Sequence, residues 1–112
     1  METFLTIYTP TYNRSYLLKQ LWESLCRQTN RHFVWVGIDD GSTDDTKRMI
    51  MALKAQSDFP IEYVYKENGG KHSAGNYAVR IAHTPLFMCV DSDDKLMEEA
   101  VSIIKILGGR RG

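Results

Sequence analysis

The sequence is poor in cysteine and in long apolar runs. Its two cysteines, Cys26 and Cys89, form no CxxC pair. Both lie in apolar patterns, so we expect small buried side chains and a reducing compartment. No apolar run approaches the roughly 20 residues of a membrane-spanning helix, and the first five residues lack the basic start of a signal peptide. These absences favour a globular domain without disulfides.

An excess of charge of one sign is also absent. The chain has 14 basic and 14 acidic residues, with a formal net charge of +0, so bulk attraction to nucleic acid or to an anionic membrane is not expected. Neither GxGxxG after the first strand nor GxxxxGK[ST] occurs. A bound phosphate would therefore have to be met by a metal ion, by Lys71 and by amides at helix N-termini.

What the sequence does have is a regular alternation of strand and helix patterns. Short apolar or β-branched runs predict strands at 4–9, 32–38, 61–65 and 86–90. Apolar residues at helical spacing predict helices at 15–28, 74–81 and 95–107. A further helix is predicted to follow the loop 39–45 and to run to about residue 56. This order predicts an α/β fold: a Rossmann-like, doubly wound, mainly parallel sheet in one domain over residues 1–107, followed by a flexible tail at 108–112.

Several residues mark the expected boundaries of these elements. Pro10 should end the first strand because proline has no N–H for a β-ladder. Ser15 is the expected N-cap of the first helix, and Ser42 with Asp45 has the spacing of a capping box before the second. Three aromatic residues lie on expected core faces and are predicted to pack there: Trp22, Trp35 and Tyr77.

The most informative stretch is Leu86 to Asp94, in which an apolar run meets a block of acids. The run predicts a strand buried on both faces, as in a parallel sheet. Asp91, Asp93 and Asp94 would then share its carboxyl end, where their carboxylates repel one another unless a cation is bound. Hard oxygen ligands on a short turn suit Mg²⁺ or Mn²⁺. The alternative is that Asp93 or Asp94 caps a helix beginning near Lys95.

Polar loops follow the other predicted strands, at 9–14, 39–45 and 68–73. In a parallel sheet they emerge at the same edge as the acidic block, where open α/β sheets bind ligands. For the loop 42–45, turn and cap chemistry is the favoured interpretation. For Lys71 a solvated lysine is the alternative to a ligand contact, and His72 is expected to face solvent or a hydrogen-bond partner.

At these four loops the chain resembles family 2 glycosyltransferases of the GT-A fold. The motifs are Pro-Thr-Tyr-Asn-Arg, Asp-Asp-Gly-Ser-Thr-Asp, Glu-Asn-Gly-Gly-Lys-His-Ser-Ala-Gly-Asn and Asp-Ser-Asp-Asp, in the family's order. The resemblance implies the nucleotide-sugar-binding half of an inverting transferase that uses a divalent ion, Mn²⁺ or Mg²⁺. It also implies a nucleotide-sugar donor, expected to be a UDP-sugar, and a saccharide or lipid-linked acceptor, with a place in the cytoplasm or at the inner face of a bacterial membrane.

The same resemblance implies roles for individual residues. Thr9 to Asn13, including Pro10, would border the base pocket, with Tyr12 against the ring. Asp40 resembles the acid that hydrogen-bonds the base, with Asp39 beside it, and Lys71 would lie near the base or phosphates. The DxD signature falls at Asp91-Ser92-Asp93. There Asp93 would be the main metal ligand, Asp91 would face the ribose or the metal, and Asp94 is a secondary candidate.

The family's general base comes from a segment well after the DxD motif, and we therefore expect no catalytic base in this chain. The last predicted helix is apolar around most of its circumference, which predicts an exposed patch along Ile103, Ile106 and Leu107 or self-association through that helix. A catalytically silent nucleotide-binding or interaction module is the alternative function. A receiver-type signalling domain or a nucleotidyltransferase fits the loops less well.

Overall fold

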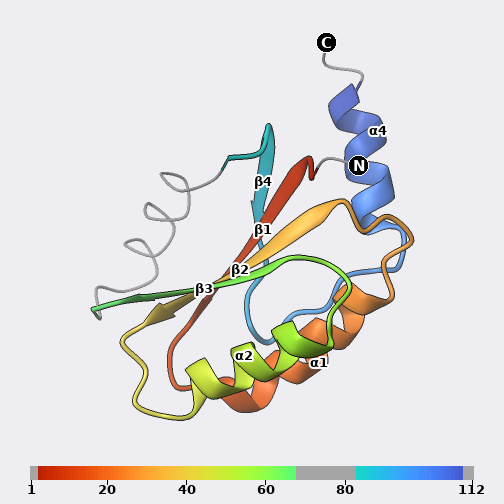
Figure 1. The fold of residues 1–112 in the computed structure, drawn as a ribbon. Helices are drawn as coiled ribbons and strands as arrows, with labels where there is room; N and C mark the ends of the chain where they lie inside the picture. Colours follow the sequence, from red (N-terminus) through yellow and green to blue (C-terminus); the bar gives the residue numbers. More distant parts are fainter. Residues whose placement is uncertain (1–2, 68–82, 110–112) are drawn as a thin grey trace.

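The computed structural model describes residues 3–67 and 83–109. Strands and helices alternate from β1 to β3, and a further strand and helix follow in 83–109 (Figure 1). In order they are β1 (Leu5–Thr11), α1 (Ser15–Cys26), β2 (Phe33–Asp40), α2 (Thr46–Gln56), β3 (Ile61–Lys66), β4 (Leu86–Cys89) and α4 (Ala100–Gly109). The four strands are all parallel, in the order β3-β2-β1-β4. The predicted α/β fold with a parallel sheet is confirmed. The helix expected at 74–81, with Tyr77, lies outside the described residues.

The main core lies between one face of the sheet and the helices α1 and α2, which run side by side (Figure 1). Alternate residues of the central strands, such as Ile7 and Trp35, point into it, as the period of two in a strand requires. Leu18, Leu21 and Leu25 of α1 are fully buried against them, one helical face as predicted. A second, smaller cluster around Val36 and Ile38 covers the opposite face of β2.

Both tryptophans pack as expected. Trp35 is buried in the main core, and its indole Nε1–H donates to Thr9 Oγ1 at 2.9 Å. Trp22 is half-buried and donates to Ser57 Oγ at 2.7 Å. Each ring thus buries apolar area while its single donor keeps a partner.

The prediction that Pro10 ends the first strand is wrong, because β1 runs on to Thr11. The Tyr8 carbonyl accepts a hydrogen bond from the Val90 N–H at 3.0 Å, so the backbone polar groups of Tyr8 point toward β4. Pro10, two residues further on, faces the same side, where the ladder with β4 has already ended at Cys89. No donor is needed there, so proline is tolerated within the strand.

β4 also differs from its prediction of a strand buried on both faces. It ends at Cys89, one residue early, and alternates between half-buried and exposed positions, with Phe87 48% exposed. Among the described strands β4 lies at an edge of the sheet and pairs only with β1. The Cys89 side chain is exposed and Cys26 is half-buried, so the prediction of two buried cysteines is wrong for Cys89.

The last helix begins at Ala100, not at Lys95 as predicted. The preceding segment is held in an irregular path by residues of α1 and the turn after it. Gln28, which is buried, donates from Nε2 to the Met97 carbonyl at 2.7 Å and accepts from the Val101 N–H at 3.0 Å. The Thr29 N–H donates to the Glu98 carbonyl at 2.9 Å. The Met97 carbonyl also accepts from the Ala100 N–H at 3.0 Å, so this segment has one local turn bond besides its bonds across the fold.

The predicted apolar patch on the last helix is present. Ile103, Ile106 and Leu107 are 50%, 58% and 57% exposed, while Val101 on the other side of α4 is fully buried in the core. Among the described residues, no helix is both long and apolar enough to cross a membrane.

Candidate functional site

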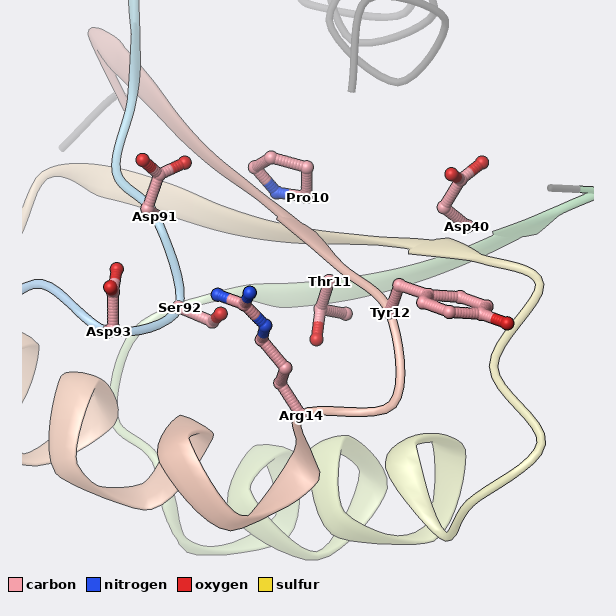
Figure 2. Close-up of a pocket in the computed structure, with 8 residues that line it drawn as sticks. All are labelled: Pro10, Thr11, Tyr12, Arg14, Asp40, Asp91, Ser92 and Asp93. Carbon is pink, nitrogen blue, oxygen red and sulfur yellow. The ribbon is translucent and has the colours of Figure 1, made fainter. Parts of the chain in front are cut away.

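A hollow of about 300 Å³ opens at the carboxyl ends of β1, β2 and β4 (Figure 2). β2 lies on one side of β1 and β4 on the other, so the strand order reverses at this point, which is where open α/β sheets bind ligands. Eight residues line the hollow: Pro10, Thr11, Tyr12, Arg14, Asp40, Asp91, Ser92 and Asp93. β1 extends three residues beyond its last pair with β4, from Tyr8 to Thr11. The space left beside this extension is occupied by the hollow.

The structure brings most of the predicted site residues together. Six of them line the hollow: Pro10, Tyr12, Asp40, Asp91, Ser92 and Asp93. Asn13 and Asp39 lie behind its wall and hydrogen-bond within the protein. Lys71 and His72 lie outside the described residues.

The acidic block after β4 is compact. Asp91, Asp93 and Asp94 each offer a carboxylate oxygen within 4.8 Å of the others. The Asp94 N–H donates to the Asp91 carbonyl at 3.0 Å, which closes the turn that gathers them. Because α4 starts only at Ala100, neither Asp93 nor Asp94 caps it, so the capping alternative is wrong.

This donor set fits a hard divalent cation. Carboxylate oxygens are the ligands that Mg²⁺ and Mn²⁺ prefer, and three of them at one turn repel one another without a cation. Asp93 and Asp94 are exposed and Asp91 is half-buried, so an ion held here would keep coordination positions open toward the hollow. Asp91 and Asp93 line the hollow, whereas Asp94 does not.

Asp40 reaches the hollow from the end of β2. Its Oδ1 accepts a hydrogen bond from Lys66 Nζ at 2.6 Å, and the two side chains are 9% and 14% exposed. Lys66 also donates to the Glu67 carbonyl at 2.8 Å. The ion pair fixes the carboxylate at the wall of the hollow, close to where Tyr12 stands half-exposed (Figure 2).

Asp39, the neighbouring acid, is buried and hydrogen-bonded within the protein. It is 2% exposed, and Tyr63 Oη donates to its Oδ2 at 2.5 Å. The Ser42 N–H donates to its Oδ1 at 2.8 Å, which shapes the turn at Gly41, where φ is 83°. Burial and the hydrogen bond to Asp39 raise the pKa of the Tyr63 phenol well above its ordinary value. Both oxygens of Asp39 are thus hydrogen-bonded inside the fold.

Asn13 joins the loops after β1 and β2. It has a φ of 51°, a conformation that asparagine adopts more readily than most residues. Its Oδ1 accepts from the backbone N–H groups of Thr43 and Asp44 at 2.8 and 3.2 Å, and its own N–H donates to Ser42 Oγ at 2.9 Å. The rim that carries Tyr12 is therefore fixed to the loop that follows Asp40.

The start of α1 is capped by residues of the other loop. Ser15 is the first helical residue and not the N-cap, so its predicted role is wrong. Its N–H donates to Asp44 Oδ2 at 3.2 Å, and its hydroxyl donates to Asp45 Oδ1 at 2.5 Å. The predicted capping box of Ser42 with Asp45 is not formed either, because α2 begins at Thr46 and Ser42 bonds to Asn13. The acids of 42–45 do serve turn and cap chemistry, as favoured from the sequence.

Two residues of the hollow had no assigned role of their own in the sequence. Thr11 falls within the predicted border 9–13, and its Oγ1 is buried without a hydrogen-bond partner among the described residues. Arg14 contributes the hollow's positive charge, from the N-cap position of α1. Its place directly after the loop 9–13, opposite a block of acids, was the available signal.

Comparisons with known proteins agree with this geometry. The model of the family "Glycosyl transferase family 2" matches residues 6–104. Chondroitin synthase of Escherichia coli is 36% identical over 98 residues, which cover 88% of this chain and 14% of the synthase. Among solved structures, S. aureus TarS 1–349 in complex with UDP-GlcNAc has a TM-score of 0.84 at 26% identity, covering 96% of this chain and 31% of that one.

The mannosyltransferase PcManGT from Pyrobaculum calidifontis, in complex with GDP-Man and Mn²⁺, has a TM-score of 0.78 at 26% identity, over 85% of this chain and 29% of that one. The chain spans between 13% and 17% of the length of four further curated relatives. It is thus similar to one part of much longer proteins. Because the family model covers nearly the whole chain and the GT-A fold agrees with it, this chain belongs to glycosyltransferase family 2.

Proposed function

We propose that the chain binds the nucleoside diphosphate of a nucleotide-sugar, expected to be a UDP-sugar, for inverting transfer to an acceptor. The observation that carries this proposal is that two separate sets of carboxylates, three side chains in all, line one hollow. Asp40 arrives from β2 on one side, and Asp91 and Asp93 arrive from β4 on the other. One group suits the N–H donors of a base, and the other suits a metal that binds phosphates. The UDP-GlcNAc and Mn²⁺ complexes of the similar proteins support the same assignment.

Under this proposal, different residues bind the base and the diphosphate of the donor. The base would lie against Tyr12 and donate to Asp40, whose carboxylate Lys66 holds in place. Pro10 and Thr11 form the wall between the two ends. Asn13 and Asp39 act one step back, by holding the loops that present Tyr12 and Asp40. Lys71 remains a proposed contact to the base or phosphates on the strength of the sequence motif.

At the other end, Asp93 would hold Mn²⁺ or Mg²⁺, Asp91 would face the ribose or the same ion, and Ser92 would lie beside the nucleotide. Such an ion, when bound, stabilises the negative charge that develops on the departing nucleoside diphosphate. We propose that the general base and the site for the acceptor, which is a saccharide or a lipid-linked molecule, lie outside this hollow. On this proposal, the chain alone should bind the nucleotide without transferring a sugar.

The test is a calorimetric titration of the purified chain with UDP, with and without Mn²⁺. We expect binding that depends on Mn²⁺ and that is lost in Asp93→Asn, because the amide keeps the shape but not the charge that holds the ion. Glu98→Gln is the matched control, since it removes a carboxylate from an exposed position outside the hollow. Failure of the folded wild-type chain to bind UDP at millimolar concentration would contradict the proposal.

A further inference from the structure

The guanidinium of Arg14 belongs to the hollow, and the proposed function gives it no role. Arg14 lines the hollow and is exposed. Within the residues that the structure describes, its side chain takes part in no hydrogen bond or ion pair. Figure 2 shows it pointing from the start of α1 into the hollow, toward the edge that carries Asp91, Ser92 and Asp93. The long, flexible side chain of Arg14 is thus directed into the hollow, and no described protein group binds its charge.

The charges in the hollow show what such a cation could bind. Asp40 is already paired with Lys66. Asp91 and Asp93 together carry the charge that balances one divalent ion. With these carboxylates paired with Lys66 or with the ion, the positive charge of Arg14 remains available to a ligand. The ligand that fits this arrangement is an anion that also coordinates the metal, which is the chemistry of a diphosphate.

We propose that Arg14 binds the diphosphate of the donor directly, on the α1 side of the hollow and opposite the metal ligands. This inference rests on the proposed function, because it assigns a phosphate contact within the same site. A guanidinium can donate two parallel hydrogen bonds to phosphate oxygens, which a lysine cannot do. Arg14 is therefore a positioning residue for the diphosphate as well as a counter-charge.

The experiment compares ligands that differ only in their phosphates. UDP with Mn²⁺ is titrated by calorimetry, and uridine is followed by NMR, in the wild type, Arg14→Gln and Arg14→Lys. The Arg14→Gln variant loses charge-assisted hydrogen bonds to phosphate, so its affinity for UDP should be about 10- to 100-fold lower than that of the wild type. Uridine binding should stay the same, and Arg14→Lys should fall in between because it keeps the charge but not the fork.

Arg27→Gln is the matched control. Arg27 is exposed at the other end of α1, at its C-cap, so this variant changes the net charge equally without touching the hollow. It should bind UDP like the wild type. Circular dichroism of each variant checks that the helix content of the chain is retained.

The outcomes separate the two proposals. Unchanged UDP affinity in Arg14→Gln would overturn the role of Arg14 and leave the proposed function intact. An equal loss of uridine and UDP binding would also overturn it, because Arg14 would then act through the shape of the base pocket. Absence of UDP binding by the folded wild-type chain would overturn the proposed function and this inference together.

Discussion

The side-chain oxygen of Asn13 accepts hydrogen bonds from both the backbone N–H and the hydroxyl of Thr43, at 2.8 and 3.3 Å. One amide thereby fixes the loop after β1 to the loop after β2. Every contact proposed for the base, at Tyr12 and Asp40, depends on the relative position of these two loops. The first prediction concerns this connection.

We expect Asn13→Ala to lower the free energy of unfolding by about 1–3 kcal/mol, because the acceptor is lost and alanine tolerates the φ of 51° poorly. Asn13→Gly keeps the backbone conformation and loses only the acceptor, so it should be less destabilised than Asn13→Ala. Asn13→Asp keeps the acceptor and should lie near the wild type. Urea denaturation of the three variants measures these differences, and equal stability of the alanine and aspartate variants would contradict the role of the side-chain oxygen.

The second prediction concerns the partly buried hydrogen bond from Tyr63 to Asp39. Tyr63→Phe removes one donor from a carboxylate that is 2% exposed, so we expect a loss of about 1–3 kcal/mol in the free energy of unfolding. Tyr65→Phe is the matched control: Tyr65 lies two residues further along β3, is exposed, and should change stability by less than about 0.5 kcal/mol.

The same pair predicts a dependence on alkaline pH. The pKa of Tyr63 is raised in the folded state above its ordinary value of 10.0, so its contribution to stability is complete below that value. It is lost as the pH rises from there toward the folded pKa. The wild type should therefore lose stability more steeply than Tyr63→Phe above pH 10.0. Parallel alkaline limbs in the two proteins would contradict this account.

The third prediction concerns acid pH. Burial acts to raise the pKa of Asp44, but the hydrogen bonds donated by Thr46 and Ser15 outweigh it, and the pKa is lowered from 3.8. A lowered folded pKa gives a contribution to stability that is present above 3.8 and is lost as the pH falls through the folded value. Stability of Asp44→Asn should fall less steeply than that of the wild type over this range.

NMR titration of the Asp44 carboxyl carbon provides a direct check. Thr46→Val removes the hydroxyl that donates to Asp44 while keeping the shape of a buried residue. The pKa of Asp44 should rise toward its ordinary value in this variant. If it stays where it is in the wild type, the hydrogen bond is not the cause of the lowered pKa.

The fourth prediction concerns the contact of β2 with α2. A Cβ added to Gly37 would lie 2.7 Å from Ile50 Cδ1, in the core. We expect Gly37→Ala to destabilise the fold by about 1–3 kcal/mol through overpacking. Ile50→Val removes the clashing methyl group and alone should lower stability by about 0.5–1.5 kcal/mol. The double variant should be clearly more stable than the sum of the two effects predicts, and additivity in this cycle would refute the clash.

Much of the fold follows from local sequence patterns. The apolar residues Leu18, Leu21 and Leu25 predict the buried face of α1, and the alternation of strands and helices predicts a parallel sheet with polar loops at one edge. That edge contains the hollow with Asp40, Asp91 and Asp93, because topology alone brings strand ends together. These features depend on period and order, which a single sequence contains.

The features that were predicted wrongly depend on partners distant in the sequence. Pro10 stays in β1 because β4 stops opposite Tyr8. The start of α4 is delayed because Gln28 hydrogen-bonds to Met97. The exposure of Cys89 reflects the place of β4 at an edge of the described sheet. No local pattern around these residues contains that information.

The caps of α1 have a consequence for the order of folding. Ser15 receives its capping contacts from Asp44 and Asp45, about thirty residues later in the chain. A nascent chain that ends before β2 thus lacks the acceptors that complete the first turn of its first helix. We expect this turn to form after β1 and β2 have paired, so that the rim of the hollow is among the last parts to become ordered. A low φ-value for Ser15→Ala in folding kinetics, beside higher values in the strand pair, would show this order.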